Sequence, residues 1–296
     1  MMERLRLQGP KTASDSDFWP NFSLFLHNAY RPRTATLHFQ YAKRYAHCLA
    51  TNNLSTLKTL PTCKRLNVMK ALSTLAKFTG VYDDFKGLLK AHGLKWTVNT
   101  DDVIIARLLK YSSNGANQNT LFEWIRSVKQ KIPDFAMFID FMIATGQRFD
   151  EALSAYNLIV QLANEGKLGE YYNAEQRVLE HFRFRSIFLR RTKKVFISFV
   201  SRELVEAMSS KGSTLTRDMI IKRVQRLHLK QSFADIHEFY ATRATKHLTP
   251  LEIDFIQGRT SATVFMRNYF NPTWISDLKD RTLKNANKLL ELASKN

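Results

Sequence analysis

The sequence PDFAMFIDFMIATGQRFDEAL, residues 133–153, is the most informative part of this chain for its fold. Residues 133–146 are almost all apolar and predict a helix that belongs to a core. Gly146 predicts the end of that helix, because glycine readily adopts the left-handed conformation common at helix ends. Arg148 lies near the start of the next predicted helix, with Glu151 three residues further on. We therefore expect an apolar helix and then a turn that presents Arg148, which could equally be a surface residue paired with Glu151.

Downstream of this turn, the sequence predicts one small sheet. Residues 182–200, FRFRSIFLRRTKKVFISFV, alternate apolar and basic residues and include β-branched and aromatic side chains. Such alternation is typical of a β-hairpin, and the polar RRTKK sequence at 190–194 predicts its tip. The remaining sequence to residue 296 has helical periodicity. The second part of the chain is thus predicted to be α-helical with a small antiparallel sheet.

Upstream, the sequence predicts a helical domain of its own. Apolar residues at helical spacing predict helices over 34–50 and 60–80, and a shorter helix ending near Gly93. Residues 1–30 predict a partly ordered lead-in.

A boundary between two domains is expected after this helical region. Residues 111–119 show no apolar periodicity and predict a linker. The fold class is therefore expected to be mainly α, with an N-terminal helical domain at 1–110 and a second domain at 120–296.

The charge of the chain indicates a polyanionic partner. Its 296 residues include 45 Lys and Arg against 26 Asp and Glu, which gives a net charge of +19 and a pI near 10.0. Residues 1–100 hold 15 basic and 5 acidic residues, so this region contributes +10 of that charge. Double-stranded DNA is the expected partner. Binding to anionic lipid is the alternative, but it is usually associated with one basic helix or a polybasic tail.

Several classes of protein are not supported by the sequence. It contains no run of 18 apolar residues and no signal-peptide segment, so we expect a cytoplasmic protein without a membrane partner. Two cysteines, the histidine spacing and the lack of a Gly-rich phosphate loop give no support for a metal site or a nucleotide site. No cofactor and no small-molecule substrate are therefore expected.

A second informative sequence, IDFIQGRTSATVFMRNYF, covers residues 253–270. Here a Gln-Gly-Arg turn ending at Arg259 closes a predicted helix, and Tyr269 follows ten residues later. Each residue has an ordinary alternative. Arg259 could simply cap the helix that ends at Gly258, since basic residues favour helix C-termini. Tyr269 could be a core aromatic residue at helical spacing from Phe265.

Taken together, these features resemble the tyrosine recombinases, or integrases, and especially their archaeal members. Ala144–Glu151 is similar to the first signature box, Ala-Thr-Gly-apolar-Arg-x-x-Glu, with Gln147 in the usually apolar position. The Gln-Gly-Arg turn and the tyrosine ten residues after its arginine are also features of the archaeal branch. That family carries a lysine at a hairpin tip between the two boxes, where Lys193 and Lys194 occur. The resemblance extends over residues 34–285, and residues 71–96 are similar to the helical core-binding domain.

The resemblance implies a site-specific DNA recombinase that cleaves and rejoins strands without metal or ATP. Tyr269 would be the nucleophile that forms a 3′-phosphotyrosyl bond, Arg148 and Arg259 would hold the phosphate, and Lys193 or Lys194 would be the general acid. The roles of the two arginines suit phosphodiester cleavage, because the phosphodiester gains negative charge in its transition state and an arginine can hold two of its oxygens.

The resemblance also implies an assembly on DNA. The working species would be a homotetramer on two DNA sites, associated with the nucleoid. The C-terminal segment 274–296 would be an exchange helix that docks on a neighbouring subunit. Its alternative is packing on its own domain.

One box departs from the family pattern. The family has His-x-x-Arg or Lys-x-x-Arg, whereas residues 233–248 here read FADIHEFYATRATKHL, with Ala234 and His237 at those positions. We expect His237 to be a weaker phosphate donor, for which His237→Arg would increase cleavage. Alternatively, the chain is a catalytically impaired relative that acts as a sequence-specific DNA-binding protein. A basic helical architectural protein is a third possibility, and Tyr240 is the next candidate nucleophile after Tyr269.

Overall fold

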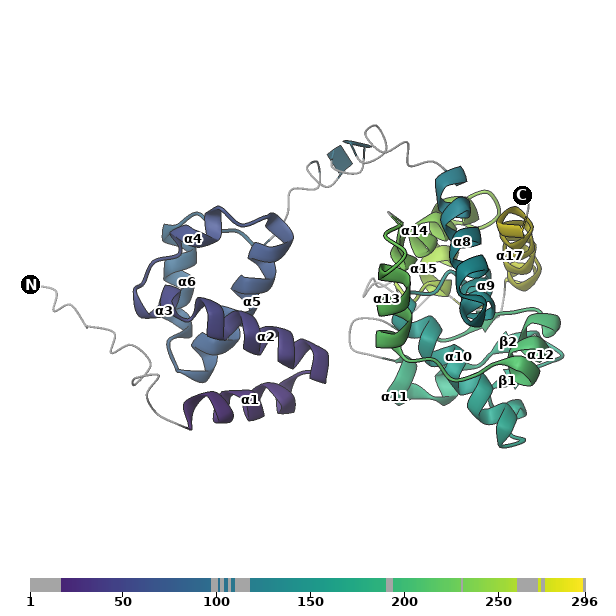
Figure 1. Cartoon of the computed structure of the whole chain (residues 1–296), viewed down its shortest axis with the longest axis horizontal. Coiled ribbons are helices and arrows are strands. Elements are labelled where there is room, and N and C mark those ends of the chain that lie inside the picture. The colour runs from purple at the N-terminus through teal and green to yellow at the C-terminus, as the bar shows by residue number, and fades with distance from the viewer. Residues whose placement is uncertain are drawn as a thin grey trace, which may run out of the picture. The chain divides into compact units, whose positions relative to one another are not determined.

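The computed structural model describes residues 17–96, 101, 104–105, 108–109, 118–189, 194–229, 231–259, 271–272 and 275–294. The chain divides into two compact units, residues 1–109 and 110–296 (Figure 1). The end predicted for the first domain, residue 110, is adjacent to this division. The predicted linker at 111–119 lies almost entirely outside the described residues.

The described part of the first unit is helical. It contains α1 (Phe18–Ala29), α2 (Pro32–Tyr45), α3 (His47–Ala50), α4 (Ser55–Lys58), α5 (Thr62–Phe78) and α6 (Tyr82–Ala91). The helix predicted over 34–50 is divided between α2 and α3, and the helix predicted over 60–80 is α5. Their apolar faces form one core, in which Met69, Leu72 and Phe85 are fully buried.

Helix α1 lies within residues 1–30, which the sequence predicts to be a partly ordered lead-in, and it belongs to the core of the first unit. Its Phe22 and Leu26 are fully buried in the core of the first unit. The Phe22 ring centroid lies 5.2 Å from that of Phe78 in α5. Residues 18, 22, 25 and 26 place apolar side chains on one helical face, which orders this segment because it can bury that face against α5. Residues 1–16 lie outside the described part.

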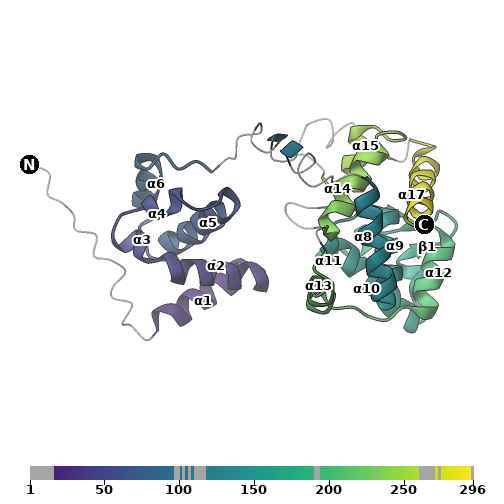
Figure 2. The ribbon, with the colours of Figure 1, turned by 45° about the horizontal axis from the view of Figure 1, so that its top comes forward.

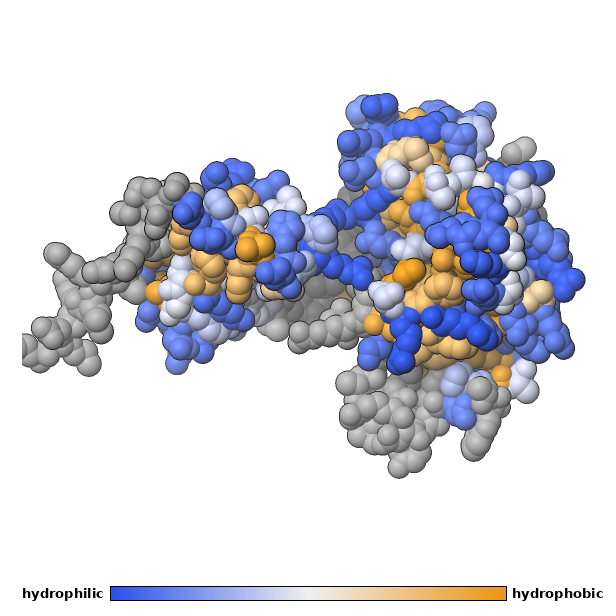
Figure 3. Space-filling view, turned by 90° about the horizontal axis from the view of Figure 1, so that it is seen from below, coloured by the Kyte–Doolittle hydropathy of each residue, from blue (hydrophilic) through white to orange (hydrophobic). Residues whose placement is uncertain are grey.

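The surface of the first unit is strongly basic. Residues 17–96 contain 12 Lys and Arg against 3 Asp and Glu, and none of these side chains is among the buried residues. Figure 3 shows hydrophilic residues spread over one face of this unit, with smaller apolar areas between them. The first unit therefore combines an apolar, aromatic core with an excess of exposed positive charge.

The second unit is built around α9 (Ala136–Thr145), the apolar helix that the sequence predicts. Its side chains Phe138, Ile139, Phe141 and Met142 are fully buried. Against it pack α8 (Gln118–Lys131), α10 (Phe149–Asn164), α12 (Arg202–Lys211), α14 (Phe233–Ala244) and α17 (Leu278–Ser294). Figures 1 and 2 show α8 and α9 side by side. In the described part of this unit, the other α-helices are α11 (Arg185–Phe188), α13 (Arg217–Gln225) and α15 (Pro250–Ile256).

A three-stranded antiparallel sheet confirms the predicted small sheet. Its order is β1 (Tyr172–Asn173), β2 (Val178–Leu179) and β3 (Ser198–Phe199). In register, Asn173 pairs with Val178 and Leu179 pairs with Ser198. Together with the helices, this sheet confirms the mainly α class.

The hairpin predicted over 182–200 is only partly present. Leu189 and Lys194 form an isolated antiparallel bridge, and residues 190–193 of the predicted tip lie outside the described residues. The N–H of Phe182 donates to the Phe196 carbonyl at 3.0 Å and that of Val195 to the Phe188 carbonyl at 3.3 Å, but β3 itself pairs with β2. Residues 181–183 form a 3₁₀ turn and α11 follows. Phe184 and Phe188 are four residues apart, and both pack against Tyr171, at ring distances of 5.2 and 6.0 Å. Helical geometry brings both rings to one side, which explains why the strand pattern fails here.

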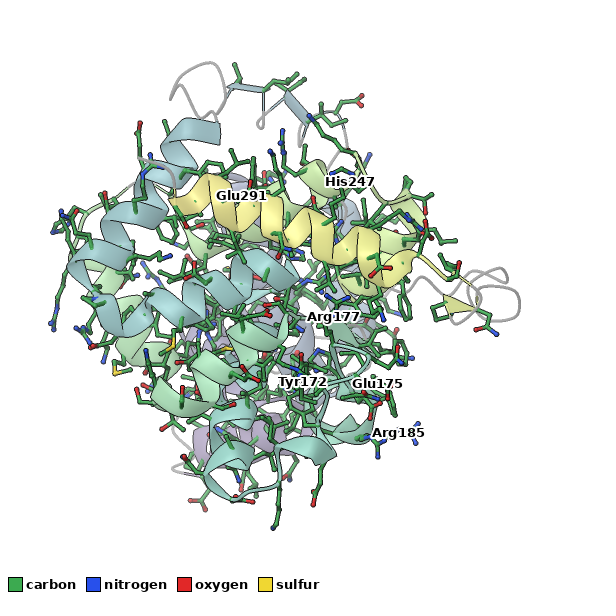
Figure 4. The ribbon with its side chains drawn as sticks, turned by 90° about the vertical axis from the view of Figure 1, so that its right-hand side faces the viewer. Tyr172, Glu175, Arg177, Arg185, His247 and Glu291 are labelled. Carbon is green, nitrogen blue, oxygen red and sulfur yellow. The ribbon has the colours of Figure 1, made fainter. Side chains whose placement is uncertain are left out.

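Helix α17 lies in the segment that the sequence predicts to be an exchange helix, and it packs on its own unit. Its Leu278 and Leu289 are buried in the core of the second unit. Arg281 donates hydrogen bonds to Glu252 of α15 at 2.7 and 3.0 Å. Figure 4 shows α17 in yellow across this side of the unit, with Arg177 of the β1–β2 turn below it in the view. The C-terminal segment is thus tied to its own unit by both apolar packing and an ion pair.

Candidate active site

The turn between α9 and α10 requires glycine at position 146. Gly146 has φ 61°, in the left-handed region. A Cβ at this position would lie 2.2 Å from the ring of Tyr240, so no larger residue fits without displacing that buried ring. The close approach brings α14, which carries Tyr240, against the start of α10, where Arg148 is the N-cap residue.

The carbonyl oxygen of Gly146 joins two distant segments. It accepts a hydrogen bond from Nδ1 of His237 at 2.6 Å and another from Nε2 of Gln257 at 3.0 Å. Gln257 is fully buried, and its Nε2 also donates to the His237 carbonyl at 3.1 Å. Gln257 therefore connects the turn after α9, helix α14 and the end of α15 at one point.

Arg148 is held by the main chain of the Gln-Gly-Arg turn. Its Nη1 donates to the carbonyl oxygen of Gln257 at 2.8 Å. Burial lowers the pKa of the Arg148 guanidinium, and the positive charge of Arg259 lowers it further. An arginine keeps its charge in proteins under such shifts, so two like charges lie near one another here.

Arg259 follows the end of α15 and is more exposed than Arg148. Its backbone N–H donates to the Asp254 carbonyl at 2.7 Å, which closes the turn. Its Nη2 lies 3.2 Å from Nε2 of His237, and its Nη1 lies 3.9 Å from a carboxylate oxygen of Asp254. The Arg259 side chain is 37% exposed. Its guanidinium is therefore oriented by the protein and still accessible to a ligand.

Gly258 brings the lysine-bearing segment to the same place. It has φ 65°, and a Cβ here would lie 2.7 Å from Val195 and 3.0 Å from the main chain of Lys194. The Lys194 N–H points to the Gly258 carbonyl at 3.4 Å. The main chain of Lys194, whose side chain is exposed, thus lies directly beside the turn that presents Arg259.

The structure therefore brings together three of the five predicted site residues, Arg148, His237 and Arg259. Lys193 and Tyr269 lie outside the described residues, so their predicted roles rest on the sequence. Ala234 is exposed in the first turn of α14, and its methyl group offers no hydrogen-bond donor.

Tyr240, the second candidate nucleophile, is not suited to that role. Its side chain is 1% exposed and its ring packs on Gly146. Burial raises the pKa of Tyr240 to about 12, which disfavours the phenolate needed for attack. This residue belongs to the core of the second unit.

On the other side of the same turn, Gln147 begins a buried network of neutral groups. Nε2 of Gln147 donates to Oγ of Ser198 at 2.7 Å and lies 2.8 Å from Nε2 of His181. Nδ1 of His181 lies 2.7 Å from the hydroxyl of Tyr171. Burial lowers the pKa of His181 to about 3, so this imidazole is neutral. Gln147 thus has polar partners in strand β3 and in the 3₁₀ turn at 181–183.

Sequence reasoning missed the two groups that organise the site. The Gly146 carbonyl has no side-chain signature, and the sequence predicts Gln257 only as part of a turn. The sequence feature that points to Gln257 is its position in the Gln-Gly pair directly before Arg259. Within the described ranges, no group of three or more His, Cys, Asp or Glu residues is placed to hold a metal ion. In the same ranges, no helix has the length and apolar character needed to cross a membrane.

The arrangement is suited chemically to binding an anion. Two guanidinium groups converge, and the hydrogen bonds that orient them come from a main-chain carbonyl and an imidazole, which carry no negative charge. Comparison with protein family models, with curated proteins and with solved structures finds no match.

Proposed function

We propose that this protein is a site-specific DNA recombinase that breaks and rejoins strands through a tyrosine, without metal or ATP. The observation that carries the proposal is the convergence of Arg148 and Arg259 on one site, each oriented by an uncharged acceptor. Such a pair suits a phosphodiester, whose single negative charge increases in the transition state. The basic surface of the first unit supports duplex DNA as the polyanion.

In this proposal the chemistry is a pair of transesterifications. The Tyr269 hydroxyl attacks the phosphorus and forms a 3′-phosphotyrosyl bond, while the bond to the 5′-oxygen breaks. Lys193 or Lys194 donates a proton to that leaving oxygen. The 5′-hydroxyl of another strand then attacks the phosphotyrosine and releases the enzyme. The energy of the phosphodiester is retained, and a homotetramer on two sites, associated with the nucleoid in the cytoplasm, would exchange the strands.

The experiment that tests this function is covalent capture on a nicked suicide DNA substrate. Wild-type protein is expected to form a protein–DNA adduct, and Tyr269→Phe is expected to form none while keeping nearly the same DNA affinity, because one hydroxyl contributes little to a large electrostatic interface. Tyr240→Phe is the matched control and should still form the adduct. An adduct that persists in Tyr269→Phe would place the nucleophile elsewhere.

A second candidate function is binding to specific DNA sequences without efficient cleavage. It is favoured by the exposed Ala234 methyl group and by His237 at a position where the related family has arginine. This candidate predicts salt-dependent, site-specific binding with no adduct on any nicked substrate. The same assay therefore separates the two functions.

A further inference from the structure

His237 lies between two groups of opposite hydrogen-bonding character. Its Nδ1 is 2.6 Å from the carbonyl oxygen of Gly146, which can only accept a hydrogen bond. Its Nε2 is 3.2 Å from Nη2 of Arg259, which can only donate one. Together these partners require a proton on Nδ1 and a lone pair on Nε2. In this arrangement the imidazole is neutral.

A neutral acceptor has a specific use beside an arginine in an anion site. A carboxylate in the place of His237 would orient the Arg259 guanidinium but would also compensate its charge. Among the described residues, the carboxylate of Asp254 lies 3.9 Å from Arg259 and is 44% exposed, so water screens that interaction. The imidazole lone pair orients the guanidinium and leaves its positive charge available to a phosphate.

From this geometry we propose that His237 is a positioning residue. As the neutral Nδ1–H tautomer it directs Arg259 toward the bound phosphate, and it does not itself donate to that phosphate. The consequence for catalysis rests on the recombinase function proposed above, whereas the tautomer and its contact with Arg259 do not. This role differs from the weaker phosphate donor that the sequence predicts.

The Gly146 carbonyl also connects the two arginines through a chain of hydrogen bonds. The Gly146 carbonyl accepts from both His237 and Gln257, and the Gln257 carbonyl accepts from Arg148. The separation of the two guanidinium groups is therefore set by buried or part-buried neutral groups. Removing the His237–Arg259 contact should release Arg259 while leaving the Arg148 contact in place.

A spectroscopic experiment tests the tautomer without requiring any cleavage. We would record long-range ¹H–¹⁵N spectra of the full chain labelled with ¹⁵N-histidine near neutral pH, with His237→Gln identifying the signal. The expected result is a protonated Nδ1 and an unprotonated Nε2, whose ¹⁵N shift changes in Arg259→Ala because its hydrogen bond is lost. A proton on Nε2, or an Nε2 shift that is unaffected by Arg259→Ala, would overturn the proposal.

Two substitutions separate the two hydrogen bonds in the adduct assay. Glutamine can place an amide oxygen near the position of Nε2 and accept from Arg259, whereas asparagine reaches only the position of Nδ1. We expect His237→Asn to reduce the rate of adduct formation about 100-fold, as for a reacting group misplaced by about 1 Å. His237→Gln should react at least tenfold faster than His237→Asn. Equal losses in the two variants would contradict a positioning role through Nε2.

Two further variants complete the test. In an Arg259→Ala background, His237→Asn should cause little additional loss, because its effect passes through Arg259. His237→Arg should not exceed the wild-type rate, since it removes the acceptor and adds a like charge. A gain of tenfold or more in His237→Arg would overturn the proposal. If wild-type protein forms no adduct at all, the recombinase function fails, while the spectroscopic result still decides the role of His237.

Discussion

The second unit contains two polar clusters, one that includes Arg148 and one that includes the adjacent Gln147. They differ in solvent exposure and in charge. The first contains Arg148, His237, Gln257 and Arg259, is open to solvent at Arg259 and brings two positive charges together. The second cluster joins Gln147 to Tyr171, His181 and Ser198. All of its members are buried, and its groups are neutral.

The difference separates two uses of the same residue types. His181 and His237 are both hydrogen-bonded histidines, and each cluster contains one glutamine. In the buried cluster the side chains hydrogen-bond to one another, although Oε1 of Gln147 has no partner among the described residues, and these bonds stabilise the fold. In the open cluster the neutral groups orient arginines without compensating them, which leaves charge for a ligand. The environment of a histidine, and not its presence in a motif, therefore indicates its role.

The largest expected effect is on catalysis, from the open cluster. Arg148→Ala should reduce the rate of adduct formation roughly 100- to 1,000-fold, the typical loss when one transition-state donor is removed. The assay is single-turnover adduct formation on the nicked substrate. Arg223→Ala is the matched control, since this arginine forms an exposed ion pair with Asp134 at 2.9 Å. A similar loss in both variants would show that Arg148 has no special role.

The next effect is on stability, from the buried cluster. His181→Phe should lower the free energy of unfolding by about 3 kcal/mol, because it removes the imidazole partner of the buried Tyr171 hydroxyl and leaves the Gln147 amide with Ser198 Oγ as its remaining partner among the described residues. Urea-induced unfolding of the full chain measures this change. The double variant Gln147→Leu with His181→Phe should recover part of the loss, since both polar partners are then removed. If the loss of unfolding free energy in the double variant equals the sum of the losses in Gln147→Leu and His181→Phe, the two residues are not coupled.

The smallest effect is a pH dependence that belongs to the buried cluster. The pKa of His181 is about 3 in the folded protein and near its ordinary value of 6.5 when unfolded. The unfolded chain therefore takes up this proton as the pH falls below 6.5, and the folded chain does not, so stability is lost on acidification. Between pH 7 and pH 5 the expected loss is about 2 kcal/mol.

Comparison with a variant isolates this contribution from other groups that titrate in the same range. The free energy of unfolding of His181→Asn should fall by about 2 kcal/mol less than that of wild-type protein between pH 7 and pH 5. Equal pH dependence in the two proteins would mean that His181 is not held neutral by burial.

The sequence predicted most of the helices because their apolar periodicity is local. Residues 133–146 and 60–80 were predicted as helices and correspond to α9 and α5. Local patterns failed where tertiary contacts override them. The 182–188 segment alternates like a strand, yet Phe184 and Phe188 pack as a helical pair on Tyr171. Helix α1 is ordered by tertiary contacts that its local pattern does not show, with Phe39 of α2 and with the more distant Phe78 of α5.

By itself, the sequence determined the helical class, the positive charge and the candidacy of Arg148 and Arg259, because composition and short spacings are properties of a linear chain. Only the tertiary structure decided that these arginines converge, that His237 faces Arg259 and that Tyr240 is buried. The groups responsible are the Gly146 carbonyl and the Gln257 side chain and carbonyl. Main-chain acceptors are the same at every residue, so a hydrogen bond between segments about a hundred residues apart leaves no pattern in the sequence.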